Sequence, residues 1–399
     1  MFPAGGFFVS RLPRIVFGFG KLKELPDIVA GYGRHGLLVT GSKSLRASKN
    51  WPLITDGLRA AGVVFESMAV EGEPAPSLVD NAVAEFRQKG IDVVVGIGGG
   101  SALDAAKAIA GLLQPGNSVL DHLEGIGRDI PYKGPATPYI AVPTTAGTGS
   151  EATKNAVLSM PGENGYKKSF RDDKLVAQVA LVDPELLATC PLEVIAANGM
   201  DAFTQMLESY VSINASQFTD ALAWSGMEAV RDSFFAAYAG GESEAARRGR
   251  AGMAYGALLS GITLAQAGLG SVHGLASPLG AFFPIPHGVA CGTLVAIATE
   301  ANIRVLRSRL PDSPALLKYA RVGELLAAKE FSRPEIAWQA LMETLHGWTD
   351  RLQMRRLGAY GIGAAQIPKI VVGSRGSSMK TNPVVLTDEE IAEIVRARL

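Results

Sequence analysis

The first half of the chain alternates short β-branched apolar runs with segments of helical spacing. Residues 91–97 form such a run, and a glycine cluster and an Ala-rich helical pattern over 102–113 follow it. Strands that alternate with helices are typical of a mostly parallel sheet covered by helices. The other predicted strands are 36–40, 63–69, 139–142 and 179–182, and a further helix is predicted over 77–89.

The character of the sequence changes near residue 188. From Leu192 onward the chain is rich in Ala, Leu and Met at helical spacing, with no convincing strand run. We therefore expect an α/β domain over 1–188 and an all-helical domain over 189–399. The predicted helices of the second domain are 202–211, 219–238, 245–265, 314–328 and 333–344.

The charge balance excludes partners that are attracted by global charge. Lys and Arg together number 38 and Asp and Glu together number 38, so no net field favours nucleic acid or an anionic membrane. The N-terminus does not resemble a signal peptide, and no apolar stretch reaches the length of about 18 residues that spans a membrane. We expect a soluble, cytoplasmic protein. Its two cysteines, Cys190 and Cys291, are expected to be buried thiols.

Two glycine-rich loops follow predicted strands. Gly98, Gly99, Gly100 and Ser101 stand between a strand and a helix, where free backbone N–H groups and the helix dipole attract phosphate. The second loop, 143–151, offers the hydroxyls of Thr144, Thr145 and Thr148. Two loops at the carboxyl ends of parallel strands suit the two halves of a dinucleotide. A tight structural turn for the first loop and a solvated surface loop for the second are the alternatives.

A carboxylate and two histidines form a candidate metal site in the second half. His273 and His287 each precede a glycine in a segment punctuated by Gly and Pro, and Asp201 is expected to open a helix, with Gln205 one turn later. Two imidazoles and a carboxylate can hold a divalent transition metal that polarises a substrate oxygen. An aspartate at a helix start is more often a simple N-cap.

Four motifs in this order resemble those of the iron-containing (group III) alcohol dehydrogenases. They are the glycine loop with Asp104 and Lys107, the 143–151 loop, the segment from Asn198 to Asp201, and the segment carrying His273 and His287. The resemblance runs from about residue 17 to the C-terminus. It implies a Rossmann-like NAD(P) domain, a helical domain, and hydride transfer between the nicotinamide and an alcohol or aldehyde in the cleft between them.

The resemblance also implies iron or zinc held by one Asp and three His. Three of these map onto Asp201, His273 and His287, but the fourth position is Gln205, and a further family histidine near the metal is Ser277. Gln is a poorer ligand than imidazole, and Ser277 cannot titrate near neutral pH as His does. Three outcomes stay open: a metal-dependent reductase with an altered site, a metal-independent reductase resembling the maleylacetate reductases, or a relative with different chemistry.

One clue bears on the choice of coenzyme. In the NAD-preferring members an Asp follows the early strand and binds the ribose 2′-hydroxyl, whereas this chain has Gly41, Ser42 and Lys43. Because no carboxylate repels a 2′-phosphate there, NADP is slightly favoured over NAD. Other positions that the resemblance assigns to the coenzyme or the cleft are Asp104, Asn155 and Lys167 (or Lys168).

The resemblance further implies a small alcohol or aldehyde as substrate and a homo-oligomer, most simply a dimer. Two rival functions remain open at this point. One is different chemistry of the wider superfamily, as in dehydroquinate synthase and glycerol dehydrogenase, although the phosphate-binding Lys/Arg set of such a synthase is not apparent. The other is a nucleotide-binding protein without enzymatic activity.

Overall fold

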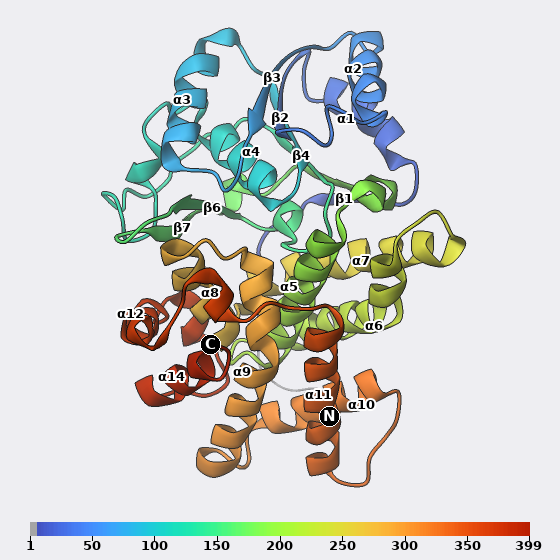
Figure 1. Ribbon diagram of the computed structural model, residues 1–399. Coiled ribbons are helices and arrows are strands. Elements are labelled where there is room, and N and C mark those ends of the chain that lie inside the picture. Colours follow the sequence, from blue (N-terminus) through green and yellow to red (C-terminus); the bar gives the residue numbers. More distant parts are fainter. Residues whose placement is uncertain (1–5) are drawn as a thin grey trace.

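The computed structural model describes residues 6–399, and a six-stranded parallel sheet forms the centre of its N-terminal half (Figure 1). The strand order is β1-β8-β5-β4-β2-β3, and every pair in it is parallel. The predicted parallel α/β architecture of the first half of the chain is therefore confirmed. The bounds are β1 Arg14–Phe17, β2 His35–Gly41, β3 Val64–Val70, β4 Val93–Gly98, β5 Tyr139–Pro143 and β8 Val179–Val182.

Helices cover both faces of this sheet because its strands are apolar on both sides. Along β2, Leu37 and Val39 pack in one cluster with α3 (Pro76–Phe86) and α4 (Gly100–Leu112). Leu38, which points the other way, packs in a second cluster with α1 (Leu25–Ala30) and α2 (Asn50–Ala60). This alternation is the two-residue period of a strand that is buried on both faces.

Three strands have no counterpart in the sequence prediction. One is the edge strand β1, and the others form an antiparallel hairpin of β6 (Asn155–Met160) and β7 (Tyr166–Arg171). The hairpin packs on α4 through β6 and against the helical domain through β7 (Figure 1). Its second strand, with four polar residues out of six, lacks the apolar run that identified the central strands.

The C-terminal half is helical, as predicted (Figure 1). Its first helix, α5, begins well before the predicted start at residue 202, so Asp201 lies in the middle of a helix and does not open one, which corrects the expectation. Helix α5 packs against α6, α7 and α9. The bounds are α5 Leu192–Val211, α6 Gln217–Ala239, α7 Glu244–Ala267, α8 Ser271–Phe282, α9 His287–Arg309, α10 Pro314–Ala327, α11 Pro334–Arg351, α12 Ile367–Gly373, α13 Ser377–Lys380 and α14 Asp388–Arg396.

One helix in the described residues, α9, has the length and hydropathy of a membrane span. Of its most apolar window, 78% is buried inside the protein. The apolar character of α9 is therefore explained by its place in the core of the helical domain.

Candidate active site and metal centre

A cavity of about 970 Å³ lies between the carboxyl edge of the parallel sheet and helices α5, α8 and α9. It unites most of the site residues expected from the sequence, although they come from widely separated segments. Four of the expected residues do not line the cavity: Ser42, Lys43, Gly98 and Thr144. The expected residues that line it are Gly41, Gly99, Gly100, Ser101, Asp104, Thr145, Thr148, Asn155, Lys167, Asp201, Gln205, His273, Ser277 and His287.

The two glycine-rich loops pack directly against each other at one end of the cavity. Strand β4 ends at Gly98 and α4 begins at Gly100, so the loop meets the N-terminus of a long helix. A Cβ atom at Gly100 would lie only 2.9 Å from the Thr148 side chain. Gly98 lies behind the loop, where its carbonyl oxygen accepts the Thr144 N–H at 2.9 Å. A glycine loop at the N-terminus of a helix offers backbone N–H groups that lack intrahelical partners, and such a cradle can bind an anion.

The turn after β2 lies beside this cradle, because β2 is the neighbour of β4 in the sheet. Gly41 lines the cavity, and a Cβ atom there would meet nothing within 4 Å. Lys43 is exposed. A side chain added at Gly41 would therefore enter the cavity without displacing the protein.

Asp104 belongs to a buried charged network beneath the cradle. Its Oδ1 accepts the Ser150 hydroxyl at 2.5 Å and its Oδ2 accepts the Val157 N–H at 3.2 Å. Lys107, fully buried on the same helix, donates to Ser150 and to the backbone oxygen of Asn155. Burial raises the pKa of Asp104, lowers that of Lys107 and raises that of the adjacent Glu151 to about 7. The network fixes the 143–151 loop and β6 against α4.

Lys167 of β7 and Ser277 of α8 also line the cavity. The Lys167 ammonium is 2.5 Å from Glu73 Oε1, and the Ser277 hydroxyl donates to the Lys167 backbone oxygen at 3.4 Å. Ser277 is on α8, which packs against β7 and so brings the two together. Burial, with the charge of Lys167 in the same direction, lowers the pKa of His287 to about 4. The charge of Lys167 also acts on Asp104, so this ammonium faces both the glycine-loop side and the histidine side of the cavity.

Asp201, His273 and His287 converge beside Ser277 and Lys167, as the sequence predicted. Asp201 Oδ1 lies 3.1 Å from Nε2 of His273 and 3.7 Å from Nε2 of His287. Burial favours the neutral acid, but the two imidazoles hold the pKa of Asp201 below its ordinary value. The three side chains come from α5, α8 and α9, so tertiary packing brings them together.

Gln205 lies one turn after Asp201 on α5 and lines the cavity. Its carbonyl oxygen, the atom that could bind a metal, accepts a hydrogen bond from the Ser260 hydroxyl of α7 at 2.7 Å. The same hydroxyl lies 3.4 Å from the backbone oxygen of Gly147. Gln205 is thus tied to the helix beneath the 143–151 loop.

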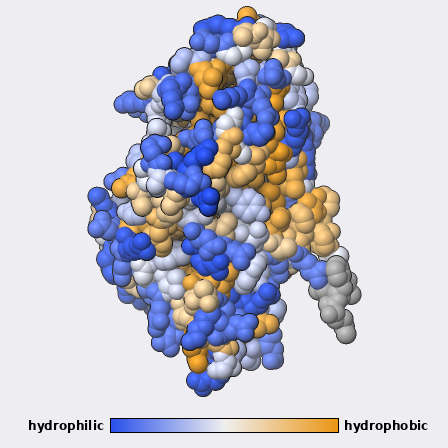
Figure 2. All heavy atoms as spheres, turned by 90° about the vertical axis from the view of Figure 1, so that its right-hand side faces the viewer, coloured by the Kyte–Doolittle hydropathy of each residue, from blue (hydrophilic) through white to orange (hydrophobic). Residues whose placement is uncertain are grey.

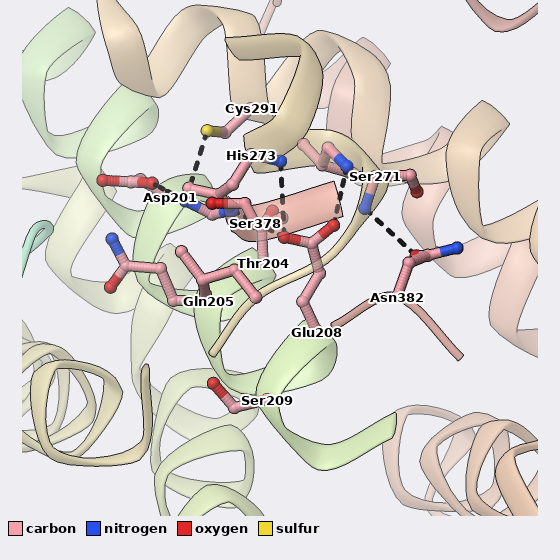
Figure 3. Close-up of polar contacts among 12 residues, drawn as sticks. Asp201, Thr204, Gln205, Glu208, Ser209, Ser271, His273, Cys291, Ser378 and Asn382 are labelled. Carbon is pink, nitrogen blue, oxygen red and sulfur yellow. Dashed lines mark hydrogen bonds and ion pairs between the residues drawn. The ribbon is translucent and has the colours of Figure 1, made fainter. Parts of the chain in front are cut away.

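Two site residues were missed in the sequence. The Glu208 carboxylate accepts from Nδ1 of His273 at 2.6 Å and from the Val272 backbone N–H at 2.7 Å. The Cys291 sulfur lies 3.6 Å from Nε2 of His273 (Figure 3). Glu208 is two turns from Asp201 and Cys291 is one turn from His287, so helical spacing was the available signal. Of the two expected buried thiols, Cys291 is buried but Cys190 is only half-buried.

Models of one protein family match nearly the whole chain. The model described as "Iron-containing alcohol dehydrogenase" matches residues 13–184, and "Fe-containing alcohol dehydrogenase family, C-terminal" matches residues 195–399. The NAD-dependent methanol dehydrogenase of Bacillus methanolicus is 33% identical over 395 residues, which cover 98% of this chain and 99% of that protein.

Two further relatives match over almost their full lengths. Alcohol dehydrogenase 4 of Saccharomyces cerevisiae is 30% identical over 397 residues, covering 98% of this chain and 97% of the yeast protein. The solved structure of an archaeal halo-thermophilic Red Sea brine pool alcohol dehydrogenase superposes with a TM-score of 0.90 at 27% identity, covering 100% of both chains. The expected resemblance is confirmed: the chain is an oxidoreductase that belongs to the iron-containing alcohol dehydrogenase family.

Proposed function

We propose that the protein interconverts a small alcohol and its aldehyde or ketone with NADP(H), or less favourably NAD(H), at a metal-assisted site. The observation that carries this proposal is that Asp201, His273 and His287 meet in the same cavity as the two glycine-rich loops. One cavity can thus hold a phosphate-bearing coenzyme at one end and the reacting oxygen at the other. The name of the Bacillus methanolicus relative supports a nicotinamide coenzyme.

The residues of both subsites fit the groups that the family implies. Asp201 offers a carboxylate and His273 and His287 offer imidazoles, which are ligands that iron and zinc accept. The loop at Gly99 and Gly100 offers a cradle that a Cβ atom at Gly100 would fill. When bound, the nicotinamide donates or accepts a hydride, and a divalent metal draws electron density from the substrate oxygen.

The residues of the chain itself would bind the coenzyme, hold it in position and move a proton. Backbone N–H groups of Gly100 and Ser101 hold phosphate at the start of α4, with Thr145 and Thr148 closing the cradle above them. Asp104 positions the 143–151 loop by accepting the hydroxyl of Ser150. The backbone oxygen of Asn155 accepts a hydrogen bond from Lys107 and so holds the strand that follows this loop against α4. Ser277 lines the cavity one turn after His273 on α8, and its hydroxyl would pass a proton between the substrate and solvent.

A reductase assay tests this proposal directly. Purified protein is mixed with a panel of short aldehydes and ketones and with NADPH or NADH, after loading with Fe²⁺ or Zn²⁺ or after treatment with a chelator. We expect oxidation of the coenzyme only with a metal present and faster turnover with NADPH. Turnover that survives full chelation supports a metal-independent reductase, and coenzyme binding without turnover supports a nucleotide-binding protein.

Gly41→Asp is expected to reverse the coenzyme preference. The new carboxylate has room in the cavity and would repel a 2′-phosphate while accepting a hydrogen bond from a 2′-hydroxyl. One unfavourable charge contact costs about 1.4 kcal/mol or more, so kcat/KM with NADPH should fall at least about tenfold. Steady-state kinetics with both coenzymes measure this. Equal loss with NADPH and NADH would show that the turn at Gly41 does not face the 2′ position.

We also propose a two-domain division near residue 188 and a homodimer. Strand β1 is at one edge of the sheet, and Ile15 within it is an exposed large apolar side chain. Phe7 and Phe8, which precede β1 in the chain, are also exposed, and the Phe7 ring stacks on Phe218 of α6. Hydrophobic residues gather along this side of the molecule (Figure 2). Burying such an edge against a second copy would protect it from uncontrolled pairing. Sedimentation of the purified protein as a monomer would contradict the dimer.

A further inference from the structure

We infer that the Cys291 sulfur is the fourth protein ligand of the metal, in the role that the missing histidine at Gln205 leaves open, and that the resulting Asp–His–His–Cys site selects zinc over iron. The inference rests on the proposed metal-assisted function. It concerns the residues Asp201, His273, His287 and Cys291, whose ligand atoms all lie within 4.8 Å of one another.

Four of the six distances among these atoms are close to those of a tetrahedral zinc site, and the other two are no longer than 4.8 Å. With zinc bonds of about 2.0–2.1 Å to nitrogen or oxygen and about 2.3 Å to sulfur, a tetrahedron separates S from N by about 3.6 Å and O from N by about 3.3 Å. The Cys291 sulfur lies 3.6 Å from Nε2 of His273 and 3.8 Å from Nε2 of His287. The Asp201 oxygen lies 3.1 and 3.7 Å from the same two nitrogens.

The donor atoms also point toward a common centre. His273 donates from Nδ1 to the buried Glu208 carboxylate, which leaves its Nε2 directed at Asp201 and Cys291 (Figure 3). A carboxylate behind a metal-binding histidine is the usual way in which such a ring is oriented. Cys291 lies one turn after His287 on α9, so both side chains emerge from the same face of one helix. No rearrangement of the backbone is needed to bring the four groups together.

Gln205 is poorly suited to the fourth position in comparison. Its carbonyl oxygen is neutral and already accepts the Ser260 hydroxyl. A thiolate supplies a full negative charge and a soft donor, which favours zinc over Fe²⁺. Zinc binding would displace the thiol proton of Cys291 to solvent, leaving a site with two anionic and two neutral ligands.

Cobalt substitution tests the ligand without reference to activity. Full-length apoprotein receives one equivalent of Co²⁺ without coenzyme or substrate, and the near-ultraviolet spectrum is recorded. A cysteinate–cobalt charge-transfer band is expected in the wild-type protein and in Cys190→Ser, and its loss is expected in Cys291→Ser. Zinc affinity should fall more than about 100-fold in Cys291→Ser, because even an outer-shell partner contributes about 10- to 100-fold.

X-ray absorption at the zinc edge of the wild-type protein gives a second measurement that needs no variant. One sulfur neighbour at about 2.3 Å is expected. A first shell of nitrogen and oxygen alone, or metal loss in Gln205→Ala with an unchanged spectrum in Cys291→Ser, would overturn the inference. If the protein reduces aldehydes and its metal has no sulfur ligand, the inference about Cys291 is wrong and the proposed function is supported. If the metal has a sulfur ligand but the protein has no reductase activity, the proposed function is wrong and the inference about Cys291 is supported.

Discussion

Asp201→Asn is expected to lower kcat/KM for aldehyde reduction about a thousand-fold or more and to strip the protein of its metal. The substitution keeps the shape of the side chain but removes the charge that faces the two imidazoles at 3.1 and 3.7 Å. A bound metal ion contributes several kcal/mol to stabilising charge on a reacting oxygen, and about 4 kcal/mol corresponds to a thousand-fold in rate. Metal content by elemental analysis and steady-state kinetics measure the two effects.

A surface aspartate supplies the matched control for Asp201→Asn. Asp232 on α6 is exposed and pairs with its neighbour Arg231, so Asp232→Asn should leave both metal content and kcat/KM unchanged. Circular dichroism of both variants checks that each is folded. Retention of metal and of wild-type kcat/KM by Asp201→Asn would exclude this carboxylate as a ligand.

The sequence predicted the strands that are buried on both faces, because such strands are continuous apolar runs. Strand β4 is a run of Val, Gly and Ile buried on both faces, and such a run between a helix and a glycine cluster leaves few alternatives. Strand β1 has only four residues at the sheet edge, and β7 reads Tyr-Lys-Lys-Ser-Phe-Arg. These strands exist because a neighbour supplies their hydrogen bonds. Their own composition does not reveal them.

The same distinction applies to the site. His273 and His287 stood out because each lies in a segment of glycine and proline, and the family motif singled out Asp201. Cys291 and Glu208 share only a helical spacing with His287 and Asp201, which is a weak signal because a cysteine or a glutamate inside a helix is ordinary. Their importance follows only when α5, α8 and α9 are packed together and place them within 3.6 Å and 2.6 Å of His273.

Gly261→Ala is expected to destabilise the protein by about 3 kcal/mol and to reduce kcat/KM about 100-fold. Gly261 on α7 lies directly against Gly149 of the 143–151 loop, and a Cβ atom there would be 2.1 Å from the Gly149 backbone oxygen. Both sides of this contact are backbone, so no side chain can move aside to relieve it. Overpacking costs about 1–3 kcal/mol, and a shift of about 1 Å in a positioning element costs about 100-fold in rate. The loop carries Thr145 and Thr148, so its displacement should weaken coenzyme binding as well.

Gly347→Ala separates this steric effect from the general effect of replacing a helical glycine. Gly347 is exposed on α11, and a Cβ atom there meets nothing within 4 Å, so this change should stabilise the protein by about 1 kcal/mol. Thermal unfolding and coenzyme titration are measured for both variants. If Gly261→Ala has the unfolding temperature and the coenzyme affinity of the wild-type protein, then the contact between α7 and the 143–151 loop does not hold the coenzyme cradle in place. Weakened binding in Gly261→Ala alone would mean that a helix of the C-terminal domain positions a coenzyme loop of the N-terminal one.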